Sequence, residues 1–213
     1  MRNISFATIA LLAAATTARA QSGRLELLEG SSLSISGTST LRKWSCKTTD
    51  LNSTLALGKG DIDPLGAGKG ARGEVDILVK SLKCGQKTMD QHMYKALKAD
   101  EFATIGYTLG KYELLPGATQ DSATLRTTGM LKIAGTSKEI TMEVRVSRSE
   151  GNLVNANGSV QLLMTDFGVK PPVVMLGMLK TGNQITVSFD LRTHIAPIVA
   201  AALTAGVGIP DTR

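Results

Sequence analysis

Regular alternation of apolar and polar residues is the feature of this sequence that most restricts its fold. The clearest case is residues 138–148 (KEITMEVRVSR), where the apolar positions are Ile140, Met142, Val144 and Val146. Successive side chains of a β-strand point to opposite faces, so a period of two predicts a strand with one buried and one solvated face. The pattern recurs along most of the chain, which predicts an all-β protein.

Short turns and glycine-rich stretches separate the alternating segments. The predicted strands cover residues 24–29, 31–40, 44–57, 74–82, 104–115, 124–133, 138–148, 152–165 and 184–193. Gly110 is expected to mark a bulge, and residues 58–73 are expected to form a surface loop because they contain many glycines and Pro64. Hairpin-length connections between about eight or nine strands favour a closed antiparallel barrel over a parallel α/β sheet.

Residues 84–102 contain the one segment with a convincing helical pattern. Its apolar stripe repeats at four-residue spacing and consists of Met89, Met93 and Leu97. Thr88 and Gln91 have the spacing of a capping box, and the helix is expected to end near Ala99. We expect this short amphipathic helix to lie at one mouth of the barrel.

Residues 1–20 have the organisation of a secretory signal peptide. Arg2 precedes an apolar run at 4–15, and Ala18-Arg19-Ala20 forms a small-residue cleavage site. The apolar run is shorter than a bilayer span, which disfavours an uncleaved membrane anchor. We therefore expect cleavage and export, and hence a periplasmic or secreted protein.

The rest of the chain is long enough for one domain with a full core. We assign residues 24–194 to a single barrel and residues 195–213 to an apolar C-terminal tail. The tail is too short to span a bilayer. Packing on the barrel, capping of one end and association with a membrane surface are all compatible with its sequence.

The chain has two cysteines, Cys46 and Cys84. In an exported protein a disulfide between them is favoured over two separate buried thiols. A metal or redox centre is disfavoured because there is no C-x-x-C pair and the chain has two histidines.

No residue pattern indicates catalysis. His92 lies one position off the apolar stripe and has no nucleophile motif near it, so a partly exposed, structurally neutral histidine is favoured over a catalytic base. Asp166-Phe167-Gly168 is expected to end a strand, with Phe167 entering the core and Gly168 permitting a tight turn. We expect no enzymatic activity and no cofactor.

The charge pattern disfavours nucleic acid as a partner. The formal net charge is +6, without a Lys/Arg run, and the scarce aromatic residues are not interleaved with basic ones. A solvated surface of mixed charge is the favoured interpretation, with transient attraction to an anionic membrane surface as a minor alternative.

The inward apolar rows have two interpretations. They could fill a closed core, or they could line a cavity that holds one elongated apolar ligand. Flexible methionines near the predicted mouth would suit a lipid chain: Met89, Met93, Met130, Met175 and Met178.

Several motifs, taken in order, resemble the YceI-like proteins. The first is Gly37-Thr38-Ser39-Thr40 followed by Trp44, and the second is the spacing of Met93, Leu97 and Phe102 before Ile105. The sequence GMLKIAGTSKEI at 129–140 looks like the hairpin of that family, and TDFGV at 165–169 resembles its late strand end. The resemblance covers about residues 25–191, and it rests on the order and spacing of the motifs together.

This resemblance implies an eight-stranded antiparallel lipocalin-like barrel, usually periplasmic, with no catalytic residues. It also implies a cavity for a polyisoprenoid or similar long lipid, such as an isoprenoid quinone or a polyprenyl chain. By position, the candidates for cavity lining or core are Trp44, Met93, Leu97, Phe102, Ile105, Leu131, Ile133 and Phe167. The Cys46/Cys84 pair and the apolar tail are not general features of the family. The remaining alternative is a structural or stress-related interaction module with a closed core and no ligand.

Overall fold

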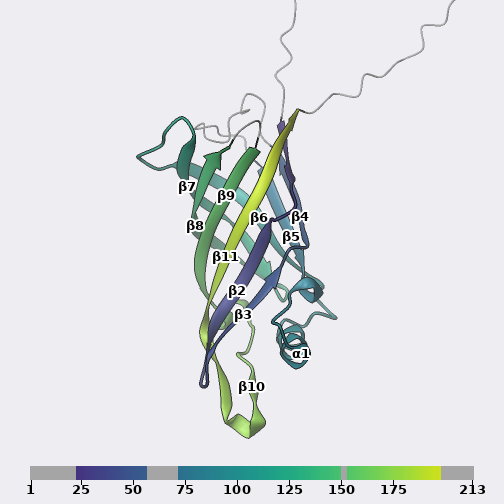
Figure 1. The fold of residues 1–213 in the computed structure, drawn as a ribbon. Helices are drawn as coiled ribbons and strands as arrows, with labels where there is room; N and C mark the ends of the chain where they lie inside the picture. The colour runs from purple at the N-terminus through teal and green to yellow at the C-terminus, as the bar shows by residue number, and fades with distance from the viewer. Residues whose placement is uncertain (1–22, 57–71, 150–152, 198–213) are drawn as a thin grey trace, which may run out of the picture.

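The computed structural model describes residues 23–56, 72–149 and 153–197, which form an antiparallel barrel with one short α-helix (Figure 1). The strands are β1 (Gly23–Leu27), β2 (Ser32–Ser39), β3 (Lys43–Thr48), β4 (Leu51–Ala56), β5 (Arg72–Leu78), β6 (Thr104–Leu114), β7 (Ser122–Ile133), β8 (Thr136–Arg148), β9 (Leu153–Leu163), β10 (Val173–Val174) and β11 (Leu179–Pro197). The helix α1 is Lys87–Ala96, and three 3-10 turns are η1 (Val79–Ser81), η2 (Met164–Phe167) and η3 (Met175–Gly177).

The strand order in the wall is β1-β4-β5-β6-β7-β8-β9-β11-β2-β3, and β1 also pairs with β11. This second pairing of β1 closes the barrel at the upper end in Figure 1. At the lower end β3 is an edge strand beyond β2. A pair of backbone hydrogen bonds between Lys47 and Lys83, 2.8 and 2.9 Å long, connects that edge to the segment before α1.

Besides the edge at β3, the wall has a gap between β8 and β9. Their pairing stops at Val144 opposite Gly158, so the lower half of β8 has no strand partner on that side among the described residues. The turn η2 contacts both strands there, and Lys138 forms an ion pair of 3.5 Å with Asp166. The barrel is therefore nearly closed, with η2 covering part of the opening.

The prediction of an antiparallel lipocalin-like barrel with one short helix is confirmed. The wall is divided more finely than predicted: residues 44–57 form β3 and β4, because the Asp50 amide bonds the Thr48 hydroxyl at 3.0 Å and turns the chain. The bulge at Gly110 is confirmed by a register shift between Leu109 and Lys111. The strand predicted at 184–193 is longer in both directions, and its end at Pro197 lies within the segment expected to be a tail.

The hairpin of β7 and β8 is tighter than predicted, since β8 begins at Thr136 directly after a two-residue turn. Ala134 and Gly135 both adopt positive φ, 48° and 82°, as a type I′ turn requires. The predicted signal peptide, residues 58–71 of the loop predicted at 58–73 and the tail beyond Pro197 lie outside the described residues. Arg72 and Gly73, predicted to end that loop, instead begin β5.

The prediction of a capping box at Thr88 and Gln91 is wrong. The helix begins one residue before Thr88, and the N-cap residue Gln86 makes no side-chain capping bond. The Asp90 carboxylate instead reaches back and accepts a hydrogen bond of 2.6 Å from the Cys84 amide. The helix also ends at Ala96, earlier than predicted, because Lys98 adopts a left-handed conformation with φ 51°.

The apolar side chains form two buried clusters. The larger lies toward α1 and includes Ile77, Val79, Leu82, Ile105 and Phe167. The smaller lies at the opposite end of the barrel and consists of Ala123, Leu125, Val144, Val146 and Val154. No helix among the described residues is long and apolar enough to cross a membrane.

Candidate ligand-binding site

A cavity of about 970 Å³ occupies the barrel interior. This volume is at the upper end of the range of roughly 300–1,000 Å³ that is typical of ligand pockets. The inward rows of most strands line it, including the row Ile140, Met142, Val144 and Val146 that dominates the sequence pattern. The prediction of apolar strand faces with a period of two is thus confirmed. These faces form the wall of an internal space.

Two buried threonines in the wall bond to the barrel backbone. Thr127 is buried and donates its hydroxyl proton to the Met142 carbonyl at 3.1 Å, and Thr193 donates to the Val154 carbonyl at 3.0 Å. A buried hydroxyl that is already bonded has little need of a ligand partner. The cavity therefore offers mainly hydrocarbon surface.

Glycines opposite aromatic residues keep this space open. A Cβ atom at Gly37 would lie 2.6 Å from the Trp44 ring, and one at Gly158 would lie 2.7 Å from Phe189. Gly129 gives Tyr107 the same room, since a Cβ atom there would lie 2.6 Å from the phenol oxygen. Each ring can lie close to a strand backbone, where it takes less of the lumen.

The cavity reaches the surface at the lower end of the barrel. Its lining there includes exposed residues from two segments, Leu41 and Arg42 in the turn between β2 and β3 and His92 on α1. Pro172, on the approach to β10, completes this rim. Figure 1 shows α1, the turn between β2 and β3 and the β10 hairpin at this lower end of the barrel.

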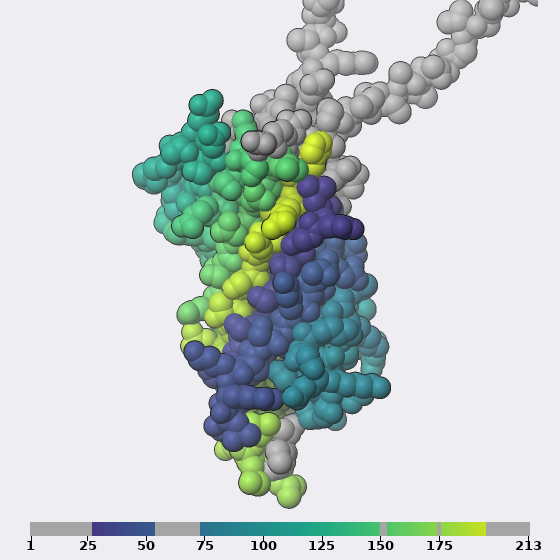
Figure 2. Space-filling view, viewed as in Figure 1, coloured from purple at the N-terminus to yellow at the C-terminus, as the bar shows by residue number. Residues whose placement is uncertain are grey.

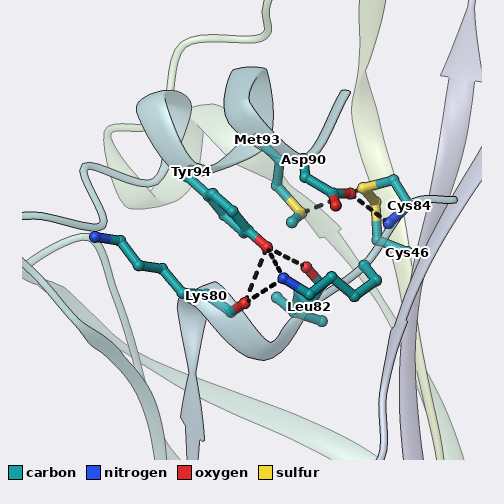
Figure 3. The surroundings of a disulfide bond; sticks show 8 residues. Cys46, Lys80, Leu82, Cys84, Asp90, Met93 and Tyr94 are labelled. Carbon is teal, nitrogen blue, oxygen red and sulfur yellow. Dashed lines mark hydrogen bonds between the residues drawn. A yellow bond between two sulfur atoms is a disulfide. The ribbon is translucent and has the colours of Figure 1, made fainter. Parts of the chain in front are cut away.

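A disulfide and a set of hydrogen bonds fix α1 beside the mouth (Figure 3). Cys46 of β3 is bonded to Cys84, which confirms the disulfide prediction. The disulfide sulfur of Cys84 lies 3.7 Å from the sulfur of Met93 on the helix. Tyr94 points its hydroxyl at the preceding segment, 2.8 Å from the Leu82 carbonyl.

Lys83 adds a charged contact to this arrangement. Its ammonium group donates to the Tyr94 hydroxyl at 2.8 Å and lies 5.4 Å from the centre of the ring. The hydrogen bond to Tyr94 raises the pKa of Lys83 above its ordinary value, although the lysine is exposed. The helix is thus held from one side, and its face with Met89, Met93 and Leu97 is left to line the cavity.

The structure brings most of the predicted site residues together around the cavity. The lining includes Trp44, Met93, Leu97, Ile105, Leu131, Ile133 and Phe167. Contact of these side chains with a ligand stays a prediction. Phe167 is also buried in the core beside left-handed Gly168, as the sequence predicts.

Phe102 does not line the cavity. Its ring packs against the tight turn at Gly135, where a Cβ atom would lie 2.6 Å away, and Lys98 lies 5.9 Å from the ring centre. The early end of α1 places Phe102 on that turn. Among the methionines, Met89 and Met93 line the cavity, whereas Met130 is 45% exposed on the outer face of the barrel.

Sequence reasoning did not single out Tyr107. Its hydroxyl is the one buried side-chain oxygen or nitrogen in the described part of the chain that has no hydrogen-bond partner. Burial raises the pKa of Tyr107, and the nearby Thr127 hydroxyl has a smaller, opposite effect. Its place in the row with Ile105 and Leu109 was a signal for its inward position, but no sequence pattern signals an unpaired hydroxyl.

The fold and the site together define the class of protein: an antiparallel barrel with an apolar internal cavity whose mouth lies beside one helix. Residues 28–193 match the model of the YceI-like domain, and the chain is therefore a member of the YceI-like family. A search of curated proteins gives no match. No group of three or more potential metal ligands among His, Cys, Asp and Glu occurs in the described residues.

Solved structures share the fold at low sequence identity. BcnA of Burkholderia cenocepacia is 15% identical, with a TM-score of 0.64 over 78% of this chain and 99% of BcnA. A polyisoprenoid-binding domain of Saccharophagus degradans, implicated in plant cell wall breakdown, is 12% identical, with a TM-score of 0.62 over 84% and 99% of the two chains. The Campylobacter jejuni YCEI protein is 19% identical, with a TM-score of 0.54 over 71% and 83%.

Proposed function

We propose that this protein is a periplasmic carrier that holds one long apolar lipid, of the isoprenoid type, in its barrel. The observation that carries the proposal is the apolar cavity of about 970 Å³ with a mouth at one end. Burial of hydrocarbon contributes roughly 25 cal/mol per Å² of ligand surface, before ordering costs are subtracted. A long chain is favoured because hydrophobic burial is nondirectional and most of the wall supplies no free polar group.

Two further observations support the ligand class and the compartment. The structurally similar Saccharophagus domain is described as polyisoprenoid-binding. The predicted signal peptide at 1–20 and the Cys46–Cys84 disulfide both suit an oxidising compartment outside the cytoplasm. The competing function, a closed structural module, would need the interior to be filled by side chains.

A lumen-filling substitution tests the proposal. Val187 lies inward on β11 and lines the cavity, whereas its neighbour Ser188 lies on the other face of the strand. We expect Val187→Trp to reduce uptake of a fluorescent polyprenyl probe at least tenfold, because the indole occupies space that the chain needs. Ser188→Trp is the matched control and is expected to bind the probe as the unmodified protein does.

Circular dichroism and denaturant unfolding of both variants show whether each remains folded. Equal probe binding by a folded Val187→Trp variant and its control would contradict a ligand inside the barrel. It would favour the closed module instead.

A further inference from the structure

The lower end of the barrel carries exposed apolar side chains on two adjacent hairpins. Leu176, at the turn η3, is fully exposed, while Met178 and Leu41 are 77% and 76% exposed. Val173 on β10 is 57% exposed. We call these four residues the apolar tip. Exposed apolar groups gathered at one place indicate a surface that leaves water when it meets a partner.

Backbone hydrogen bonds join the two hairpins into one unit. The Thr40 amide donates to the Lys180 carbonyl at 3.0 Å, and the Thr40 hydroxyl donates to the Met178 carbonyl at 3.2 Å. Thr181 of β11 lies opposite Ser39 of β2, which continues the contact into the barrel wall. The apolar tip is therefore built on the sheet and has a defined position relative to it.

The backbone at η3 turns tightly through two consecutive residues with positive φ. Leu176 adopts φ 56° and ψ 33°, a left-handed conformation that a branched side chain disfavours. Gly177 follows with φ 92°. Figure 1 shows this hairpin, labelled β10, extending beyond the other strands at the lower end, and Figure 2 shows the same segment protruding from the molecular surface.

Basic residues flank the tip. Arg42, Lys43, Lys170 and Lys180 are exposed, and none of the ion pairs formed among the described residues involves them. The sequence contains no Asp or Glu between residues 30 and 49 or between 167 and 189. The two hairpins that carry the tip therefore bear basic side chains and no acidic ones, which complements anionic lipid headgroups.

We propose that the apolar tip and its basic flanks dock this protein onto an anionic lipid bilayer, with the cavity mouth facing the membrane. Apolar side chains would enter the hydrocarbon boundary while the flanking cations contact phosphate groups. Leu41 belongs to both the tip and the cavity lining, so the docked mouth opens beside the bilayer. Docking would serve the transfer of a lipid, and in that respect the inference rests on the proposed function. Attachment of the protein to the bilayer does not itself require a bound lipid.

Sedimentation with lipid vesicles tests this docking. The full mature chain is mixed with vesicles of phosphatidylcholine and phosphatidylglycerol in equal parts, and with vesicles of phosphatidylcholine alone. We expect binding to the anionic vesicles, and at least a tenfold loss in Leu176→Gln/Met178→Gln. Met130→Gln is the matched control, since Met130 is an exposed methionine of β7 that is not part of the apolar tip, and it is expected to bind normally.

The charge contribution is tested separately. Arg42→Gln/Lys180→Gln is expected to weaken binding by about fivefold for each residue, and only on anionic vesicles. Equal binding by the tip variant, its control and the unmodified protein would overturn the proposal. A dimer in solution that the tip variant abolishes, without vesicle binding, would also overturn it and assign the tip to a second copy of the chain.

Uptake of the polyprenyl probe from detergent separates docking from cargo binding. A tip variant that loses vesicle binding but retains the probe supports docking as a separate property. Vesicle binding by a protein that takes up no probe would leave docking standing and remove the proposed carrier function.

Discussion

At the scale of single residues, the buried Tyr107 hydroxyl is out of keeping with its surroundings. It has no hydrogen-bond partner in the described structure, while the neighbouring Thr127 hydroxyl is bonded to a strand carbonyl. Leaving such a group unpaired costs about 1–3 kcal/mol. The ring itself fits, because Gly129 makes room for it.

We therefore predict that Tyr107→Phe stabilises the folded protein by about 1 kcal/mol without loss of probe binding. The effect is measured by urea unfolding at neutral pH. A clear destabilisation would show that the hydroxyl has a partner in the working protein, and simultaneous loss of the probe would identify that partner as the ligand.

The same variant has a predicted pH dependence. Because burial raises the pKa of Tyr107 in the folded state, the neutral phenol is favoured by folding. The contribution of this raised pKa to the free energy of unfolding is fully present below the unfolded-state pKa of about 10. It is lost as the pH rises through the folded-state pKa. The advantage of Tyr107→Phe over the unmodified protein should therefore grow above pH of about 10, and an unchanged difference there would contradict a buried phenol.

At the scale of elements, β3 is the edge of the wall and the disulfide fixes it to the segment before α1. The Cys46–Cys84 bond closes a loop with a sequence separation of 38. In the chain-entropy model, losing such a bond costs about 3–4 kcal/mol. The backbone pair at Lys47 and Lys83 and the 2.8 Å hydrogen bond between the Thr48 and Ser81 hydroxyls then remain as links between β3 and that segment.

We predict that Cys46→Ala/Cys84→Ala lowers the free energy of unfolding by about 3–4 kcal/mol and speeds release of the probe. Denaturant unfolding and probe-release kinetics measure the two effects. The reduced, unmodified protein is the control and should behave similarly. A loss of stability below about 1 kcal/mol in both would mean that the hydrogen bonds, without the disulfide, hold β3 in place.

Sequence reasoning predicted those elements that are encoded by a pattern of neighbouring residues within one segment. The alternation of Ile140, Met142 and Val144 identified the inner face of β8, and Gly110 identified the bulge in β6. The helix boundaries were less accurate, because Asp90 bonds the Cys84 amide across a turn and Lys98 takes a left-handed conformation. Both depend on contacts and backbone geometry that spacing alone does not encode.

At the scale of the whole molecule, sequence reasoning left one question open: whether the inward rows fill the barrel or surround a space. The answer depends on how rings and glycines from different strands meet. Gly37 lies opposite Trp44 in the β2–β3 pairing, and Gly158 lies opposite Phe189 in the β9–β11 pairing. The sequence of a single strand predicts that apolar residues form the wall. It does not predict the register in which two strands pair, and that register brings each glycine opposite its ring.

The tip is the other whole-molecule feature that the sequence alone did not reveal. Leu41 and Leu176 are far apart in the chain, and bonds through Thr40 bring their hairpins together at the mouth. The four large apolar residues of the described structure that are more than half exposed, Leu41, Val173, Leu176 and Met178, thus all lie at this end of the barrel.

Native mass spectrometry of the mature protein, purified from its own cells and followed by organic extraction, tests the central claim most directly. We predict one adduct of several hundred daltons per chain that extracts as a long-chain isoprenoid lipid and is absent from Val187→Trp. A clean apo mass, combined with failure to take up added isoprenoid chains, would contradict the carrier function and indicate a barrel with a structural role.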